Sequence, residues 1–259
     1  MNTKIKKGLV GVGLLAGLMV GGFAQAADSG WSSGFELDLN SKYIWRSLAW
    51  SEGTVLQPSV WVASSGLLFS VWSNFVLNNE PNRRQFNEID FRISYEMEIG
   101  GFSIVPAFNY YAYPNQDKIE NPTTGELEIQ VAYGMGDFTL ETSHFLDIRE
   151  NKGGYVGEVG LEFEKDAAEG LTIAAAARLV FANSKFNAFY VPYEKGALNA
   201  LVLEAGLTFT FANGFYLRPH LEWNNMLDKN LRAAVEVSDW ISIQKPNLFN
   251  IGVALGFEF

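Results

Sequence analysis

Apolar and polar residues alternate along several stretches of the chain, most clearly in Gly34–Arg46 and Asn87–Ile99. In the first stretch the alternating apolar residues are Phe35, Leu37, Leu39, Tyr43 and Trp45. In the second they are Ile89, Phe91, Ile93, Tyr95, Met97 and Ile99. Successive side chains point to opposite faces of a β-strand, whereas a helix would scatter them. Both stretches are therefore predicted to be strands with one apolar and one polar face.

The same two-residue period predicts strands in residues 155–164, 201–211, 215–223 and 250–259. Weaker strands are predicted at Val55–Ser64, Leu67–Leu77, Phe102–Tyr113, Glu126–Met135, Phe138–Asp147 and Leu171–Ala182. In Val55–Ser64 and Phe102–Tyr113 both parities are apolar, so the pattern does not assign their faces. Proline donates no hydrogen bond to a sheet, so Pro58, Pro106 and Pro219 predict bulges or imperfect strand boundaries.

The connections between predicted strands alternate in length. The short ones are Ser64–Gly66, Gly100–Gly101, Gly136–Asp137, Asp166–Gly170 and Ala212–Gly214. The long ones are Leu48–Thr54, Asn78–Gln85, Pro114–Gly125, Arg149–Gly153, Asn183–Ala197 and Leu227–Pro246, the last of which is expected to hold a short helix or an inward-folded loop. Short turns at one rim and long loops at the other are typical of outer-membrane barrels. We therefore predict an all-β, transmembrane, antiparallel up-and-down barrel of about 12 strands with both termini at the short-turn rim.

A soluble barrel would show the same alternation, but with its apolar residues inside and its polar residues outside. Other features of the sequence must therefore distinguish a soluble barrel from a membrane-spanning one. Aromatic residues make up 14% of the chain. On the apolar parity they gather near strand ends, at Trp45, Phe102, Phe138, Phe163, Phe211, Phe215 and Trp223. Aromatic girdles of this kind mark the two membrane interfaces, which favours the membrane-spanning barrel.

The N-terminus has the layout of a secretory signal. Lys4, Lys6 and Lys7 precede the uncharged apolar run Gly8–Phe23, and Ala24-Gln25-Ala26 then provides small residues for cleavage. We expect residues 1–26 to be a cleaved signal peptide and residues 27–259 to form a single barrel domain in the bacterial outer membrane. Cleavage leaves 16 basic against 29 acidic residues, a net charge of −13, which disfavours nucleic acid as a partner.

The polar parity of the predicted strands is expected to line an enclosed lumen. The candidate pore-lining residues are Glu88, Asp90, Arg92, Glu96, Glu158, Glu162, Arg178, Glu204, Arg218, His220 and Glu222, with Glu36, Asp38, Lys42, Arg46, Glu98, Glu126, Glu128 and Glu164 on the same parity. Acids outnumber bases in this set, and acidic pore linings favour cations. Barrels of this size fall between filled eight-stranded barrels and open porins, so we expect a narrow or partly plugged lumen.

Two segments support a resemblance to known proteins. The chain ends with apolar residues at alternate positions up to a terminal phenylalanine: Phe259, Phe257, Leu255, Val253 and Ile251. This ending resembles the recognition strand of bacterial outer-membrane proteins, which implies insertion by the barrel assembly machinery. Ser41–Ser47, followed by Ser51 and Pro58, resembles the S-x-Y-x-x-R-G opening of a proteobacterial family of uncharacterised outer-membrane barrels, with Ser47 in place of the usual glycine. That resemblance implies a barrel and no particular activity.

The sequence leaves three candidate functions. The first is a narrow channel for small cationic or neutral solutes, and the second is a structural or adhesive barrel without transport. The third, a lipid-modifying enzyme, is disfavoured because Ser143 and His144 are adjacent in a strand and should face opposite sides. The chain has no cysteine and only two histidines, so we expect no metal site and no cofactor, and the oligomeric state stays open.

Overall fold

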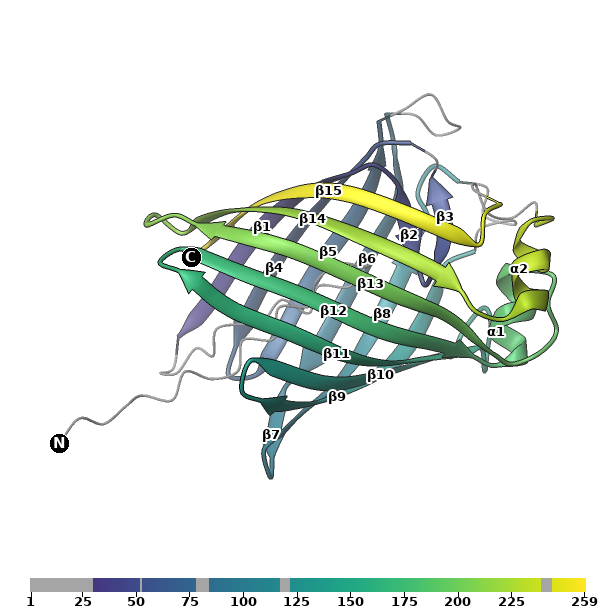
Figure 1. Ribbon diagram of the computed structural model, residues 1–259, viewed down its shortest axis with the longest axis horizontal. Helices are drawn as coiled ribbons and strands as arrows, with labels where there is room; N and C mark the ends of the chain where they lie inside the picture. Colours follow the sequence, from purple (N-terminus) through teal and green to yellow (C-terminus); the bar gives the residue numbers. More distant parts are fainter. Residues whose placement is uncertain (1–29, 52, 78–83, 117–121, 239–243) are drawn as a thin grey trace.

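The computed structural model describes residues 30–51, 53–77, 84–116, 122–238 and 244–259, which form one closed antiparallel barrel (Figure 1). The wall has twelve strands, because β6 and β7 are successive parts of one strand that pairs with β8. The wall strands are β1 (Trp31–Asn40), β4 (Val55–Ser64), β5 (Leu67–Val76), β6 (Phe86–Tyr95) with β7 (Met97–Ile99), β8 (Phe102–Ala112), β9 (Thr124–Met135), β10 (Phe138–Asp147), β11 (Tyr155–Ala168), β12 (Leu171–Ala182), β13 (Ala197–Thr210), β14 (Phe215–Met226) and β15 (Asn247–Glu258). The predicted fold class is thus confirmed.

Consecutive wall strands are hydrogen-bonded neighbours, and β15 pairs with β1 to close the wall. The turns at residues 65–66, 100–101, 136–137, 169–170 and 211–214 lie at one end, the short-turn rim, together with the start of β1 and the end of β15. The longer connections lie at the opposite end, the long-loop rim. The predicted turn at Asp166–Gly170 is too long, because β11 continues to Ala168 through a register shift. The predicted signal peptide, residues 1–26, lies outside the described residues.

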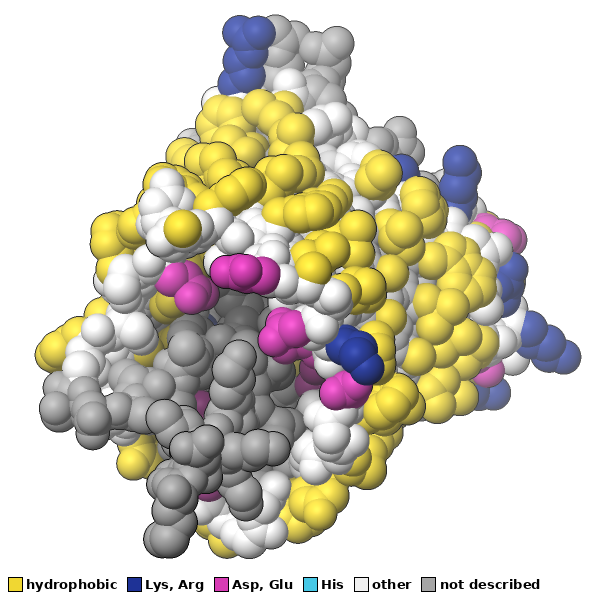
Figure 2. Space-filling model, turned by 60° about the vertical axis from the view of Figure 1, so that its left-hand side comes forward, with side chains coloured by type: hydrophobic (Ala, Val, Ile, Leu, Met, Phe, Trp, Pro, Cys, Tyr) yellow, Lys and Arg dark blue, Asp and Glu magenta, His cyan; other side chains and the backbone are white. Residues whose placement is uncertain are grey.

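The two faces of the wall differ sharply in chemistry. Phe91 and Leu203 point outward and are each 38% exposed, whereas Glu204 points inward and is 3% exposed. Figure 2 shows hydrophobic side chains covering the outer wall, with acidic side chains around the opening of the barrel. In water such an exterior would be costly, whereas a bilayer covers it. The protein is therefore a membrane-spanning barrel of the outer-membrane type, a class in which the long loops face the cell exterior.

The three strand prolines interrupt hydrogen bonding without shifting the register. Between β4 and β5 pairing stops at Leu56 and resumes at Ser59, and it is interrupted similarly around Pro219. Pro106 on β8 faces the break between β6 and β7, and the register is the same on both sides of it. The alternative of a bulge at these prolines is therefore wrong, since each removes a donor but keeps the alignment.

The first predicted strand is shorter than its alternation indicated. β1 ends at Asn40, and the chain then folds inside the barrel as the inward hairpin, formed by β2 (Tyr43–Trp45) and β3 (Leu48–Ser51). Tyr43 and Trp45, predicted to face lipid, are instead buried, 3% and 7% exposed. The prediction that Leu48–Thr54 is a long loop at the rim is also wrong, because Leu48 and Ala49 are buried in this hairpin inside the barrel.

Aromatic rings at the short-turn rim form the predicted girdle. Phe102 packs against Tyr133 with ring centroids 4.9 Å apart, and Phe138 packs against Phe163 at 5.2 Å. The terminal strand takes part, because the Phe257 ring lies 4.5 Å from the rings of both Phe215 and Phe259. The alternating residues Ile251, Val253 and Leu255 are exposed on the outer face of β15. The girdle thus continues across the strand that closes the barrel.

Two short helices lie at the long-loop rim (Figure 1). Helix α1 (Ser184–Tyr190) follows β12, and helix α2 (Lys229–Val235) follows β14, where a short helix or an inward loop was predicted. Both helices bury apolar residues, including Phe186 and Leu231. None of the helices in the described part of the chain has the length and hydropathy needed to cross a membrane.

Candidate functional site

The inward hairpin places a buried arginine in the lumen at the long-loop side. The Arg46 guanidinium donates two hydrogen bonds to Glu126 of β9, at 2.7 and 2.5 Å, and the Tyr111 hydroxyl donates a third to the same carboxylate at 2.8 Å. Arg46 and Ser47 form the hairpin turn with φ of 49° and 64°. Left-handed backbone of this kind is unfavourable for residues with a side chain, so the surrounding contacts must stabilise it.

Aromatic rings surround that arginine. The Arg46 guanidinium carbon lies 4.2 Å from the ring centroid of Trp45, 4.6 Å from that of Phe145 and 5.5 Å from that of Phe186. Guanidinium groups are attracted to aromatic faces, more strongly where water is excluded. The hairpin is further held to the wall because Ser47 Oγ donates to Asn224 Oδ1 of β14 at 2.8 Å. Hairpin, α1 and wall therefore form one packed unit that fills this part of the lumen.

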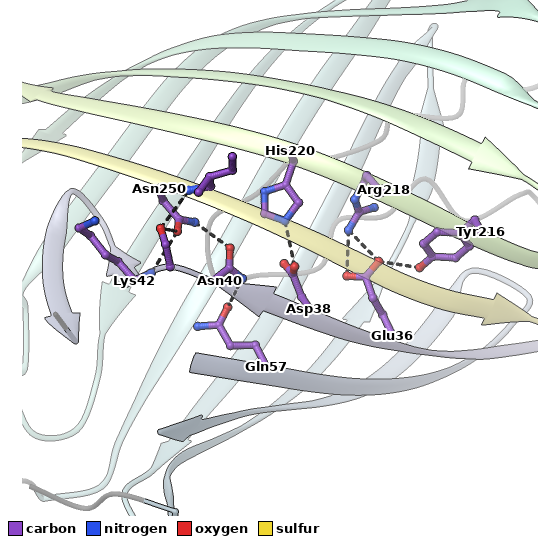
Figure 3. Close-up of polar contacts among 11 residues, drawn as sticks. Glu36, Asp38, Asn40, Lys42, Gln57, Tyr216, Arg218, His220 and Asn250 are labelled. Atoms are coloured by element: carbon purple, nitrogen blue, oxygen red, sulfur yellow. Dashed lines mark hydrogen bonds and ion pairs between the residues drawn. The ribbon is translucent and has the colours of Figure 1, made fainter. Parts of the chain in front are cut away.

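Beyond the hairpin, toward the short-turn rim, ionic contacts cross from β1 to β14 over the terminal strand (Figure 3). Arg218 Nη2 donates to Glu36 at 2.7 Å, and the Tyr216 hydroxyl donates to the same carboxylate at 2.6 Å. His220 Nε2 lies 2.9 Å from Asp38 Oδ1. These pairs skip β15, which lies between β1 and β14.

Small residues on β15 make these crossings possible. The inward positions of β15 beside the ionic contacts are Gly252, Ala254 and Gly256. A Cβ at Gly256 would lie 2.1 Å from Tyr216 Cζ, and one at Gly252 would lie 2.3 Å from His220 Cε1. Both distances are far below van der Waals contact, so glycine is required here for close approach.

A second cluster uses the same arrangement on the neighbouring strands β10 to β13. Arg178 of β12 donates to Glu141 of β10 at 2.8 Å, reaching across β11 where Gly160 lies between them. Arg178 is also paired with Glu162 and Glu204. Three carboxylates thus share one guanidinium, and the cluster carries an excess of negative charge.

A third cluster lines β6, β8 and β9. Arg92 donates to both oxygens of Glu128 at 3.2 Å, and Asn109 donates to the same carboxylate at 2.8 Å. Glu88 and Asp90 are buried nearer the inward hairpin, where the Tyr43 side chain is hydrogen-bonded to Glu88. Among the described residues no hydrogen-bond donor reaches Asp90 Oδ1. Buried carboxylates without full pairing are costly, which makes this region a candidate for solvent or solute contact.

Side-chain amides form a continuous ladder around the remaining wall. Asn250 donates to Asn40 at 2.7 Å, Asn40 to Gln57 at 3.0 Å and Gln57 to Asn74 at 3.0 Å. Asn74 then donates to Asn87 at 2.7 Å, so the ladder spans five neighbouring strands. It gives this part of the lumen a polar surface without net charge.

Most of the predicted pore-lining residues face the lumen, but not all are equally enclosed. Arg92, Glu162, Arg178, Glu204, His220 and Glu222 are buried, and Glu158 and Arg218 are half-buried. Glu96 lies at the short-turn rim, exposed, and accepts a hydrogen bond from Ser103 at 2.8 Å. Sequence reasoning missed Glu141, which lies in the weakly predicted strand Phe138–Asp147, and it missed the amide ladder because it assigned no lumen role to inward amides.

The serine and histidine considered for lipid hydrolysis lie on opposite faces, as their adjacency predicted. His144 faces outward, where Nε2 lies 3.1 Å from Thr142 Oγ1 and Nδ1 lies 2.6 Å from the Tyr155 hydroxyl. Ser143 has the inward parity of Phe145 and Asp147. A search of the described residues finds no group of three or more His, Cys, Asp or Glu side chains suited to a metal ion.

No protein-family model and no curated protein matches the sequence. Among solved structures, the chain is similar to the KdgM porin in complex with disordered oligogalacturonate, with 11% identity and a TM-score of 0.49 over 88% of this chain and 99% of that one. It is similar to the NanC porin with 12% identity and a TM-score of 0.49, over 87% and 98% of the two chains. The translocator domain of the autotransporter NalP from Neisseria meningitidis gives 11% identity and a TM-score of 0.48, over 91% and 90%. Function must therefore be read from the chain's own side chains.

Proposed function

We propose that the protein is an outer-membrane channel for small cationic or neutral solutes, with the inward hairpin as its constriction. The observation that carries this proposal is a polar, charged lumen narrowed by a loop segment rather than by the wall. Buried charges destabilise a barrel relative to apolar packing, so a purely structural barrel has no physical need for them. A hydrated pathway does need them, since polar linings replace the water that surrounds a solute.

The lumen chemistry supports cations and neutral molecules over anions. Arg178 is shared among three carboxylates, and among the described residues no guanidinium forms an ion pair with the lumen residues Glu158 and Glu222. The exposed rim residue Glu96 adds negative charge at the short-turn opening. Acidic rings of this kind raise the local cation concentration.

Conductance of the purified barrel in planar bilayers tests the proposal. We expect small single-channel steps and a reversal potential shifted toward the cation equilibrium in a salt gradient. Heat-modifiable migration on gels must first show that the sample is folded. A folded wild-type barrel without conductance at any voltage would refute the channel.

The packed long-loop half favours one alternative, a structural or adhesive barrel. Trp45, Tyr190 and Phe186 lie in contact within the lumen, and Trp50 packs against them. If this packing is permanent, the lumen stays sealed and the long-loop rim is the functional surface. Conductance of the wild-type barrel would indicate the channel, whereas a wild type that never conducts, with or without conductance after hairpin removal, would indicate the sealed barrel.

Insertion by the barrel assembly machinery belongs to the same proposal. It is supported by the exposed alternating residues of β15 and by Phe259, whose backbone N–H donates to Ser33 O at 2.9 Å. Replacing Phe259 with Ala should reduce the amount of barrel recovered from outer membranes. Equal recovery of the variant and the wild type would count against this partner.

A further inference from the structure

The lipid-facing wall carries a polar cluster near the long-loop rim. Thr142, His144 and Tyr155 lie on the outward face of β10 and β11, where the neighbouring residues Leu140 and Leu146 are 48% and 41% exposed. The His144 ring lies between the other two side chains, 3.1 Å from Thr142 Oγ1 and 2.6 Å from the Tyr155 hydroxyl oxygen. Polar groups on a hydrocarbon-facing surface are costly and frequently functional, so this cluster requires an explanation.

The cluster is a shaped surface rather than an isolated polar side chain. A Cβ at Gly157 would lie 2.4 Å from Phe181 Cζ and 2.8 Å from the Tyr155 hydroxyl, so both rings close over the glycine. The His144 and Tyr155 rings are stacked, with centroids 6.0 Å apart. Because the Thr142 proton is directed to Glu158 O, a neutral His144 donates from Nε2 to Thr142 and accepts at Nδ1 from the Tyr155 hydroxyl, whose oxygen can still accept a hydrogen bond from a further group.

The cluster is suited to binding rather than to hydrolysis. The Thr142 hydroxyl donates to Glu158 O at 2.8 Å, so its proton is directed away from His144. The surrounding backbone N–H groups belong to the β10–β11 and β9–β10 ladders. No donor on this face is therefore free to stabilise an oxyanion, which ester hydrolysis requires.

Three exposed basic residues lie directly beyond the cluster, at the tip of the β10–β11 hairpin. Arg149 and Lys152 belong to the connecting turn, and Lys185 of α1 donates from Nζ to Lys152 O at 3.2 Å. The Arg149 guanidinium carbon lies 5.7 Å from the ring centroid of Tyr110, on the outer face of β8. None of the three forms an ion pair with a carboxylate of the described residues.

We propose that this surface, defined by Arg149, Lys152 and Lys185 above Thr142, His144 and Tyr155, binds the phosphorylated headgroup of a lipid in the exterior leaflet. The basic side chains lie where the headgroup phosphates of that leaflet lie, and the Tyr155 hydroxyl lies deeper, where its oxygen can accept from a sugar or glycerol hydroxyl of the lipid. Acyl chains would cover the exposed leucines around the cluster. The occupant is a membrane lipid because the surface belongs to the face that contacts the bilayer.

The distribution of charge along the barrel supports this placement. At the short-turn rim the described basic residue is Lys165, which is paired with Asp137 at 3.1 Å. At the long-loop rim the described basic residues are Arg84, Arg149, Lys152, Lys185, Lys195, Lys229, Arg232 and Lys245. The acidic chain thus presents most of its exposed positive charge to one leaflet.

Lipid titration of the detergent-solubilised full barrel, followed by native mass spectrometry, tests the proposal. We expect phosphatidylglycerol to bind more tightly than phosphatidylcholine, and the difference to shrink with added salt. A basic residue near an anionic lipid surface usually raises affinity about fivefold. The triple variant Arg149→Ala, Lys152→Ala, Lys185→Ala should therefore lose at least about tenfold in phosphatidylglycerol affinity. Tyr155→Phe should lose about two- to tenfold, the usual range for one hydrogen bond.

A matched control removes the same charge elsewhere, through Lys165→Ala, Lys195→Ala and Lys229→Ala. It should keep wild-type affinity for phosphatidylglycerol, and all variants should keep heat-modifiable migration and wild-type conductance. Equal losses in both triple variants would overturn the site. So would equal binding of the two lipids, or displacement of phosphatidylglycerol by an equal concentration of inorganic phosphate. The lipid readout does not require an open channel, so it is independent of the proposed transport.

Discussion

Gly252 and Gly256 show how single residues determine the lumen chemistry. Each is an inward residue of β15 over which polar side chains of β1 and β14 meet. A neighbouring strand is about 4.8 Å away, so side chains two strands apart can meet only over a position without bulk. Gly160 has the same role beneath Arg178 and Glu141.

A larger residue at Gly256 should break the β1–β14 contact. In Gly256→Leu the new side chain would displace Tyr216 and separate Arg218 from Glu36, and we expect a loss of about 1–3 kcal/mol in stability from overpacking. The temperature at which the barrel loses its heat-modifiable migration measures this effect. Val253→Leu, on the outer face of the same strand, is the control and should change little. A stable Gly256→Leu barrel with the contact intact would contradict the role of this glycine.

Arg46 is the residue on which the inward hairpin depends most. Arg46→Met should destabilise the barrel by about 3–5 kcal/mol, because it leaves Glu126 buried without its cation. The double variant Arg46→Met, Glu126→Gln should recover much of this loss, since the remaining amide can be satisfied by Tyr111. Denaturation in urea and detergent provides the comparison. If the single variant were as stable as wild type, the pair would not hold the hairpin.

The residue scale also shows where sequence reasoning fails. The inward position of Glu204 follows from alternation, but its sharing of Arg178 with Glu141 depends on register across the four strands β10 to β13. Register is not encoded by a period of two residues, which is the same for every even shift. The sequence therefore predicts which charged residues face the lumen, but it does not predict which of them form ion pairs with each other.

At the scale of elements, the inward hairpin is the main departure from expectation. The alternation that predicts β1 continues through Tyr43 and Trp45, which keep the two-residue period within the hairpin and pack against aromatic rings, while Ile44 between them packs with Ala49 and Leu248. The break comes from the bend at residues 41–42, where Ser41 Oγ and Lys42 N both donate to Asn250 Oδ1. This interaction joins residues more than 200 positions apart. A local pattern cannot reveal it.

Replacing residues 41–54 by a short Gly–Ser linker should enlarge the pathway. The wall strands β1 and β4 pair along their full length without the hairpin, so the barrel should remain closed. Without the hairpin we expect larger and more frequent conductance steps in planar bilayers. A linker in place of the β10–β11 turn, residues 148–153, serves as the control and should leave conductance near wild type. Unchanged conductance in the hairpin variant would place the constriction elsewhere.

Helix α2 should respond to pH through Asp228, the residue that caps its N-terminus. Backbone N–H groups of Leu231 and Asn230 donate to Asp228 at 2.9 Å each and hold the pKa of that carboxyl below its usual value. This stabilisation is complete above the ordinary aspartate pKa of about 3.9 and is lost as pH falls through the lowered value. Amide chemical shifts of Asn230 and Leu231 across acidic pH measure it. Asp228→Ala should abolish the transition and weaken the helix by about 0.5–2 kcal/mol, and a persisting transition would assign it to another group.

At the scale of the whole molecule, the barrel is asymmetric along its axis. The short-turn opening has exposed acids such as Glu96, the middle has shared ion pairs, and the long-loop side is filled by the inward hairpin and helices. A cation entering from the short-turn rim meets negative charge first and the packed constriction last. Rectification of current is the expected result of such a profile.

Neutralising the short-turn opening should reduce cation preference. In Glu96→Gln the rim loses an exposed charge while the hydrogen bond with Ser103 can persist, so the fold should be unaffected. We expect the reversal potential in a salt gradient to move toward zero by a few millivolts, most clearly at low ionic strength, because salt screens such charges. Glu194→Gln, an exposed position at the other rim, should leave it unchanged. Identical potentials for Glu96→Gln and wild type would exclude the rim from selectivity.

The overall architecture could be predicted well because it depends on local features of the sequence. Side-chain alternation, turn residues and connection lengths are enough to define a closed barrel with its two rims. Whether the lumen is open depends instead on where a loop folds, which is decided by contacts such as Arg46 with Glu126. The shape was therefore predictable, and the degree of opening was not.

The small inward face of β15 has a consequence for the order of assembly. Because the Glu36–Arg218 and Asp38–His220 contacts each skip one strand, they can form only after the last strand has taken its place between its two neighbours. The two contacts are therefore present only in a barrel whose wall is closed. The chain contains no cysteine, so a pair introduced by Glu36→Cys and Arg218→Cys, about 10 Å apart across two strand spacings, would label only finished molecules with a short bifunctional reagent.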